Sequence, residues 1–369
     1  MNLQEMFRRE VAKKPIYVPG KSVDEMKREY NIDKIVKVGS NENPLGPSPM
    51  AVRAVQEAAA TMNLYPDDYG YRLKEKLAQK HDLDVKNIVL GNGGTEILKM
   101  FAECFINEGD EAIVPSTTYN KYATEVGFLG GVPVVVPTKE NFAIDVEGMV
   151  KAVTDKTKLL FICNPNNPTG NIVPKEQIKW LIENTPEHVT IILDEAYYDY
   201  AIFSDEYEDT RPYLDQRETL VILRTFSKSA GLAGVRIGYA LANEEIATAL
   251  NRTKLTFGVN CFALAAGIAA LDDTEHIETA KALNRRSIEM MEAYFEKRGL
   301  PYVKSYANFI FVDVQRDVRE VYNELLKLGV VTRGGHLWKL DHWLRISTTT
   351  EENTQIILDA LEKVLFGEG

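Results

Sequence analysis

Cysteine is scarce in this 369-residue chain, and the few cysteines it has are not paired. Only Cys104, Cys163 and Cys261 occur, far apart and without a CxxC spacing. A disulfide framework or a cysteine zinc site needs paired or closely spaced cysteines, so neither is expected, and a reducing compartment is the simpler interpretation. The five histidines show no HExxH spacing. We therefore expect no metal site.

Long apolar runs and an excess of positive charge are also missing. No stretch reaches the roughly 18 uninterrupted apolar residues that a membrane span needs. The chain carries 43 basic and 54 acidic residues, a net charge of −11 at pH 7. Nucleic acid and anionic lipid are poor electrostatic partners for such a chain. We expect a soluble, cytoplasmic protein that acts on small molecules.

The chain is rich in apolar residues, and their pattern is typical of an α/β protein. Hydrophobic residues make up 45% of it, and short apolar runs alternate with amphipathic stretches such as TEILKMFAECF, which have helical spacing. Strands that alternate with helices predict a largely parallel, seven-stranded sheet flanked by helices on both faces. The expected strands cover residues 87–93, 111–115, 132–137, 158–164, 189–195, 220–226 and 235–242.

The pattern changes after about residue 265. Long charged helices are followed there by NFIFVDV, a further helix and LRISTTTEEN, which is typical of a smaller α+β lobe. We predict a large domain over residues 41–264 and a small C-terminal domain over residues 265–369. The N-terminal segment, residues 1–40, is expected to pack on the small domain.

Several predicted strands end in polar or glycine-rich segments. These are GNGGTE (91–96), CNPNNPTG (163–170), LDEAYY (193–198) and RTFSKS (224–229). In sheets of this class, ligands bind at the carboxyl ends of the strands. The sequence therefore predicts a functional site at that edge.

Lys228 and Asp194 are the central candidates in these segments. Lys228 lies between two serines and precedes Arg236 by eight residues, which suits a phosphate-bearing aldehyde that needs an amine and phosphate donors. A solvated surface lysine is the alternative. Asp194 ends an apolar strand, where a carboxylate is costly unless it meets a cation. A protonated pyridine nitrogen is such a cation, and a helix cap or a buried ion pair is the alternative.

Two glycine- or proline-rich turns complete the pattern. GNGGTE places small residues between a strand and a helix, so that backbone amides can approach a phosphate. It matches neither GxGxxG nor GxxxxGK[ST], which argues against a dinucleotide or ATP. In NPNNPTG, Asn167 is placed to donate to a ring oxygen, with a plain loop as the alternative.

Taken in order, GNGGTE, NPNNPTG, DEAYYDY and TFSKSAGLAGVRIGY resemble the signature motifs of class I and II aminotransferases. These are fold-type I enzymes that depend on pyridoxal 5'-phosphate. IYVPGKSVDEMKREYN, VGSNENPLGPSP and LYPDDYG resemble the N-terminal half of the histidinol-phosphate aminotransferases. The resemblance covers nearly the whole chain. It departs at TFGVN (256–260) and GGHLWKLDHW (334–343), where substrate selection would occur.

The resemblance implies a role for each matching residue. Lys228 would form the Schiff base with the cofactor and later move a proton. Asp194 would pair with the pyridine nitrogen, and Asn167 and Tyr197 would bond the 3'-oxygen of the ring. The cofactor phosphate would be held by Gly94, Thr95, Thr225, Ser227 and Arg236.

Further residues are implied at the edges of the site. Tyr122 would stack on the cofactor ring, with Tyr119 as the alternative register. Tyr65 would reach the cofactor phosphate of a neighbouring subunit, which makes a homodimer the functional unit. Arg345 would clamp the carboxylate of glutamate. The remaining candidates for substrate contact are Arg333, Asn43 and Tyr17, and for Arg333 and Tyr17 an ordinary surface position is the alternative.

These roles lead to amino transfer between L-histidinol phosphate and 2-oxoglutarate, in histidine biosynthesis, as the first hypothesis. An aromatic or broad-specificity aminotransferase is the alternative suggested by His336, Trp338 and Trp343 in the departing segment. A lyase or decarboxylase that uses the same cofactor is a further one. A transcription regulator with an aminotransferase-like domain is not expected, because the cofactor-domain motif already begins at Asn41 and the chain is acidic.

Overall fold

The computed structural model describes residues 3–12, 21, 23–30, 32 and 34–367. Its central sheet has seven strands in the order β2-β8-β7-β6-β5-β3-β4. All neighbours pair in parallel except β8, which runs antiparallel to β2 and β7. The prediction of a largely parallel seven-stranded sheet is confirmed. The strands are β2 (Ile88–Gly91), β3 (Glu111–Pro115), β4 (Val132–Val136), β5 (Thr157–Cys163), β6 (Thr190–Asp194), β7 (Leu220–Thr225) and β8 (Gly238–Ala242).

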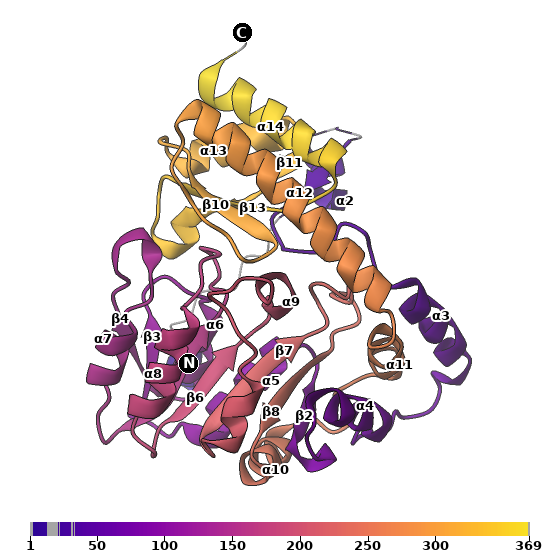
Figure 1. Ribbon diagram of the computed structural model, residues 1–369, viewed down its shortest axis with the longest axis vertical. Helices are drawn as coiled ribbons and strands as arrows, with labels where there is room; N and C mark the ends of the chain where they lie inside the picture. The colour runs from indigo at the N-terminus through magenta and orange to yellow at the C-terminus, as the bar shows by residue number, and fades with distance from the viewer. Residues whose placement is uncertain (1–2, 13–20, 22, 31, 33, 368–369) are drawn as a thin grey trace.

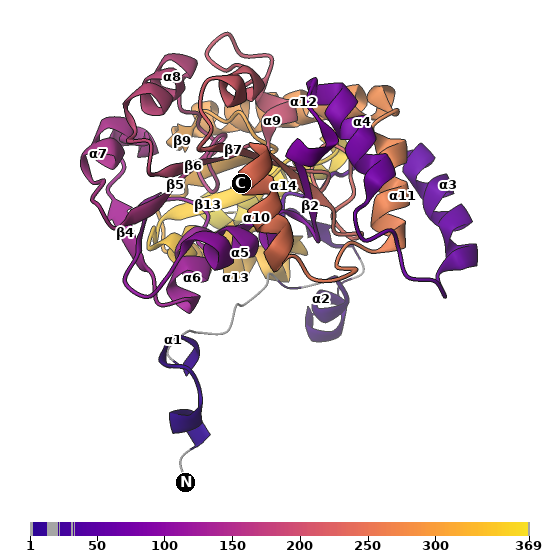
Figure 2. The same ribbon diagram turned by 90° about the horizontal axis from the view of Figure 1, so that it is seen from below.

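Helices cover both faces of this sheet (Figures 1 and 2). Side chains alternate along each strand, so that Phe161 of β5 joins one core and Ile162 the other. The first face is covered by α5 (Gly94–Phe105), α6 (Lys121–Phe128) and α10 (Glu244–Thr253). The second is covered by α4 (Tyr71–His81), α7 (Val146–Lys151), α8 (Lys175–Asn184) and α11 (Cys261–Ala270), with α3 (Pro49–Ala58) packed on α11.

A second, four-stranded antiparallel sheet has the order β12-β13-β10-β9. We call this sheet, with helices α13 and α14, the small lobe, and the seven-stranded sheet with its covering helices the large lobe. The long helix α12 runs from one lobe to the other (Figure 1). These elements are β9 (Tyr302–Val303), β10 (Phe309–Asp313), β12 (Arg333–Gly334), β13 (Trp343–Ser347), α12 (Thr274–Arg298), α13 (Val318–Lys327) and α14 (Glu351–Phe366).

The described N-terminal residues contact both lobes. Strand β1 pairs with β11, and Met26 of α2 packs on Leu326 and Val331 beside the small sheet. Farther upstream, the Arg8 guanidinium donates to the carbonyl of Phe128 at the end of α6, 2.7 Å away. The elements here are α1 (Arg9–Ala12), α2 (Val23–Tyr30), β1 (Val36–Lys37) and β11 (Val330–Val331).

No helix in the described part of the chain combines the length and the apolar character that a bilayer crossing requires.

Short helical turns connect the larger elements. The turns are η1 (Leu3–Met6), η2 (Ala59–Thr61), η3 (Val85–Asn87), η4 (Glu140–Phe142), η5 (Arg211–Asp215), η6 (Gly335–Trp338) and the four-residue helix α9 (Tyr198–Ala201).

Candidate active site

Lys228 lies in the turn that follows β7 and is partly buried. Its Nζ donates to the backbone oxygen of Asn41 at 3.3 Å and lies 5.6 Å from the centre of the Tyr197 ring. Burial, with the nearby positive charges of Arg345 and Arg236, lowers the pKa of Lys228 from 10.5 to about 8. The amine therefore gives up its proton far more readily than an ordinary lysine.

Asp194 is the last residue of β6, and only 6% of it is exposed. One carboxylate oxygen accepts from the Tyr122 hydroxyl at 2.7 Å, and the other accepts from the Ala196 amide at 3.1 Å. Burial raises the pKa of Asp194 to about 6, although both donors oppose the rise. A cation placed against this carboxylate would offset the cost of burying its charge.

A chain of buried hydrogen bonds connects the two lobes at this edge. The Tyr197 hydroxyl oxygen accepts from the side-chain amides of Asn41 at 2.9 Å and Asn167 at 3.3 Å. Arg345, on β13 of the small lobe, donates to Asn167 Oδ1 at 2.5 Å and to the Gly39 carbonyl at 2.7 Å. The predicted residues Asn167, Tyr197 and Arg345 thus belong to one network, which reaches Lys228 through Asn41.

Asn41 is a member of this network that was not among the predicted site residues, although the sequence marked it as the start of a motif. It has a left-handed backbone, with φ of 57°, which asparagine tolerates better than most residues. Its backbone amide and side-chain oxygen both bond the Ser347 hydroxyl, and its carbonyl accepts from Asn308 at 3.0 Å. Nearby, Asn43 donates to the Ser229 carbonyl at 2.8 Å, so its amide supports the turn after Lys228.

The start of α5 forms a cradle for an anion. The cap residue Gly93 has φ of 74°, and a side chain there would collide with the Arg236 guanidinium. The missing side chain lets Arg236 lie over the helix start, where backbone amides point outward. Arg236 and Thr95 also line a cavity of about 350 Å³.

The end of β7 lies against the same helix start. Thr225 pairs with Gly238 across the sheet, and a Cβ on Gly238 would collide with the Gly94 backbone nitrogen. The Thr225 hydroxyl donates to the Ser227 hydroxyl at 2.9 Å. The predicted phosphate residues Gly94, Thr225 and Ser227 therefore come from elements that touch one another.

Tyr122 does not fit the predicted role of a ring stacked on the cofactor. It is 1% exposed and already stacks on Phe161, with ring centres 4.8 Å apart. Because α6 begins at Lys121, residue 122 turns into the core, and its hydroxyl bonds Asp194 instead. Tyr119 precedes the helix, is half-exposed and meets Tyr122 edge-on. The alternative register therefore suits the stacking role better.

Three further predicted residues lie at the periphery or outside the described chain. Arg333 of β12 is directly opposite Arg345 of β13, so both side chains leave the same face of the small sheet. Tyr65 is 82% exposed and stacks on Phe257, with ring centres 4.5 Å apart. Tyr17 falls outside the described residues.

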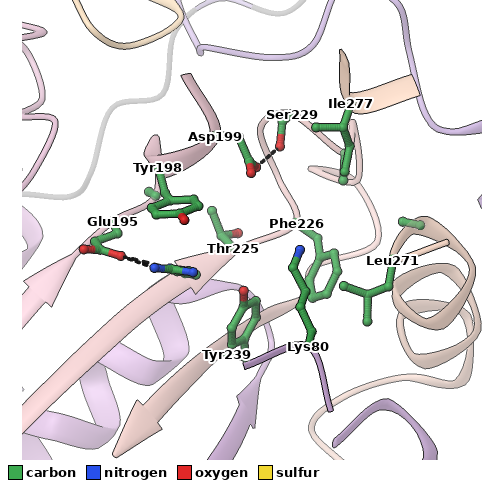
Figure 3. A pocket seen from close by; sticks show the side chains of 14 residues that line it. Lys80, Glu195, Tyr198, Asp199, Thr225, Phe226, Ser229, Tyr239, Leu271 and Ile277 are labelled. Atoms are coloured by element: carbon green, nitrogen blue, oxygen red, sulfur yellow. Dashed lines mark hydrogen bonds and ion pairs between the residues drawn. The ribbon is translucent and has the colours of Figure 1, made fainter. Parts of the chain in front are cut away.

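A small cavity of about 40 Å³ is lined by Thr225, Phe226 and Ser229, which flank Lys228 in the chain (Figure 3). Its wall includes a buried ion pair between Arg224 and Glu195, 2.8 Å apart, with the guanidinium 3.7 Å from the Tyr198 ring centre. Ser229 also donates to Asp199 there. This cavity has room for a few water molecules, and the Arg224–Glu195 ion pair in its wall joins the ends of β6 and β7.

The seven-stranded sheet, with an easily deprotonated lysine, a buried acid and an anion cradle at one edge, defines an α/β transferase that handles amines. The chain belongs to the family "Aminotransferase class I and II", whose family model matches residues 33–361. The resemblance noted from the motifs is confirmed, and the fold is that of the fold-type I transferases.

Proteins of known class match this chain over nearly its full length. The histidinol-phosphate aminotransferase of Caldicellulosiruptor saccharolyticus is 42% identical over 360 residues, 98% of this chain and 100% of the relative. The histidinol-phosphate aminotransferase of Moorella thermoacetica is 44% identical over 350 residues, which cover 95% of this chain and 90% of the relative. The solved structure of histidinol-phosphate aminotransferase from Sinorhizobium meliloti, in complex with pyridoxal-5'-phosphate, has a TM-score of 0.90, 28% identity and 97% coverage of both chains.

Proposed function

We propose that this enzyme transfers an amino group between L-histidinol phosphate and 2-oxoglutarate, with pyridoxal 5'-phosphate as cofactor, in histidine biosynthesis. The near full-length relatives of that activity support this choice. The observation that carries it in the site is Arg345, buried beside Asn167 with Arg333 opposite. Two arginines at paired positions on one face of the small sheet suit a substrate phosphate and a carboxylate alike.

The residues of the site fit this cofactor. When bound, pyridoxal 5'-phosphate supplies an aldehyde that takes up the amino group and a ring that stabilises negative charge at the substrate Cα. Asp194 would face the ring nitrogen, Asn167 and Tyr197 the 3'-oxygen, and Tyr119 the ring face. The phosphate would be held by Gly94, Thr95, Thr225, Ser227 and Arg236.

Lys228 would provide both the covalent anchor for the cofactor and the base. With its pKa near 8, its amine is unprotonated in a useful fraction of molecules near neutral pH. Nζ would serve as the base that takes and holds the proton of the substrate Cα. Asp194 would keep a proton on the ring nitrogen, and Tyr122 would hold Asp194 in place.

Tyr122→Phe tests this support of Asp194. The substitution keeps the ring on Phe161 but removes a donor that lowers the pKa of Asp194. We expect cofactor affinity to fall about tenfold, a typical effect of losing a hydrogen bond to a charged group. The measurement is titration of the cofactor-free protein, followed by absorbance. Tyr207→Phe is the matched control, because its buried hydroxyl bonds the Asn164 carbonyl instead. Equal affinities for the two variants would contradict the role.

We further propose a homodimer in which Tyr65 reaches the cofactor phosphate of the partner subunit. Tyr65 belongs to a group of exposed apolar and aromatic residues in the segments 62–71 and 255–257, which meet where Tyr65 stacks on Phe257. Such exposed apolar groups are typical of an interface. The group contains Met62, Leu64, Tyr65, Tyr69, Tyr71, Leu255 and Phe257.

Sedimentation and a tyrosine substitution test the dimer. We expect a mass about twice 41.6 kDa and, for Tyr65→Phe, a several-fold loss of cofactor affinity with the dimer intact. Tyr69→Phe is the control, since Tyr69 is similarly exposed. A monomeric enzyme, or equal cofactor affinity in both variants, would argue against this arrangement.

Amino transfer to aromatic amino acids is the second candidate function. The Trp338 ring centre lies 5.7 Å from the Arg345 guanidinium, so an aromatic surface borders the proposed anion subsite. A donor panel with 2-oxoglutarate separates the two activities. Omitting 2-oxoglutarate separates both from a lyase or decarboxylase, because only the transferase needs an acceptor for sustained turnover.

A further inference from the structure

We propose that Trp338 is a positioning residue for Arg345, and that its hydrogen bond to the large lobe sets the affinity of the anion subsite. The proposal rests on the proposed amino transfer, because it assigns Arg345 to the anionic group of the substrate. It gives a role to the segment 334–343, where the chain departs from the usual glycine-rich pattern of its family.

The first observation is a pair of hydrogen bonds between the lobes. The Trp338 indole Nε1 donates to the Thr118 carbonyl at 2.9 Å, across 220 positions of sequence. At the preceding residue, the Leu337 carbonyl accepts from the Asn120 side-chain amide at 3.2 Å. Both bonds join η6 of the small lobe to the loop before α6 of the large lobe. The indole is therefore fixed at its polar edge by a residue outside its own lobe.

The second observation is that the Arg345 guanidinium lies close to two aromatic side chains. Its guanidinium carbon lies 5.3 Å from the Phe309 ring centre and 5.7 Å from that of Trp338. Contacts within about 6 Å are attractive for a cation and restrict the rotation of the planar group. Arg345 is 6% exposed, and its burial from water strengthens its interaction with an anion.

The two observations together join the anion subsite to the cofactor loop. Thr118 directly precedes Tyr119, the residue proposed to stack on the cofactor ring. Trp338 therefore bridges the loop that carries Tyr119 and the arginine that would hold the substrate. Its loss is expected to weaken substrate binding and to leave the proton transfer at Lys228 unaffected, because the contacts described for Trp338 are with Arg345 and Thr118 and not with Lys228.

Two substitutions separate the hydrogen bond from the ring. Trp338→Phe keeps an aromatic face but loses the donor to Thr118, and we expect KM for 2-oxoglutarate and for glutamate to rise about fivefold. Trp338→Ala loses the ring as well, and we expect a rise of about 30-fold. In both variants kcat is expected to stay within about twofold of the wild type.

Trp343→Phe is the matched control for these variants. Trp343 lies in the same segment, but its ring stacks on Phe311, with centres 5.0 Å apart. The same chemical change there is expected to leave KM within about twofold of the wild type. A comparable rise in KM for Trp343→Phe would overturn the assignment of the effect to the Trp338 contact.

Calorimetric binding of succinate to the holoenzyme gives a readout that does not depend on turnover. Succinate is a dicarboxylate with no carbonyl to accept an amino group, and its dissociation constant is expected to rise in the order wild type, Trp338→Phe, Trp338→Ala. A wild type that binds succinate but does not transfer amino groups would refute the proposed function and leave this order testable. An active wild type whose variants keep its KM and succinate affinity, or lose only kcat, would overturn the role of Trp338.

Discussion

Replacing Lys228 with alanine is expected to abolish amino transfer between glutamate and 2-oxo acids. Lys228 provides the only amine in the hydrogen-bond network at this edge of the sheet, as far as the described residues show. It is proposed both to bond the cofactor and to move the Cα proton. Loss of both roles should lower kcat by at least about 10⁴-fold. The absorbance band of the lysine-bound cofactor should disappear with the activity.

Lys80→Ala is a suitable control for this substitution. Lys80 lines the small cavity that also contacts Phe226 and Ser229, the neighbours of the Lys228 turn. Its removal should leave the absorbance band in place and change kcat by less than about threefold. Retention of both the band and the turnover in Lys228→Ala would contradict the assignment.

Asp194→Asn is expected to have the second largest effect. The amide keeps the shape of the carboxylate and its place beside the Tyr122 hydroxyl, but it cannot hold a proton on the ring nitrogen by charge. Without that proton the ring is a weak electron sink, so kcat is expected to fall by about 10³-fold. Cofactor affinity should fall as well, because an ion pair is replaced by a neutral contact.

Although Asp194→Asn is expected to weaken catalysis and cofactor binding, it is expected to stabilise the cofactor-free protein above about pH 6. The folded-state pKa of Asp194 is about 6, above its usual 3.8. Folded protein thus binds this proton more tightly than unfolded protein does. This tighter proton binding adds to the free energy of unfolding below about pH 4. The added stability is lost as pH rises through about 6, which lowers the free energy of unfolding by about 3 kcal/mol.

Urea unfolding at pH 5 and pH 8 tests whether burying the Asp194 charge destabilises the cofactor-free protein. The asparagine variant carries no charge to bury, so at pH 8 the cofactor-free variant should be at least as stable as the cofactor-free wild type. Its relative advantage should shrink at pH 5, where wild-type Asp194 is largely protonated. A variant that is less stable at both values, and that binds the cofactor normally, would show that the buried carboxylate has another function.

Much of the fold and part of the site follow from sequence pattern. The seven apolar runs correspond to β2 through β8 because buried parallel strands need continuous apolar sequence. The polar residues that end those runs meet at one edge because the strands point the same way. Asp194 at the end of β6 and Lys228 just after β7 are examples.

Other parts of the site depend on three-dimensional geometry that cannot be predicted from the pattern of a single sequence. The choice between Tyr119 and Tyr122 depends on where α6 begins, since a shift of three residues moves a side chain from the open loop into the core. Asn41 owes its position to a left-handed backbone. Trp338 and Thr118 meet only because two lobes pack together.

The most direct test of the proposed function is a comparison of kcat/KM for different amino donors with 2-oxoglutarate as acceptor. The donors are L-histidinol phosphate, phenylalanine and tyrosine. The site, with Arg345 and Arg333 at paired positions of neighbouring strands, is expected to favour histidinol phosphate by at least about 100-fold, since a bidentate contact with phosphate contributes on the order of 3 kcal/mol. Equal or higher values for the aromatic amino acids, or no turnover of histidinol phosphate, would contradict the proposed function.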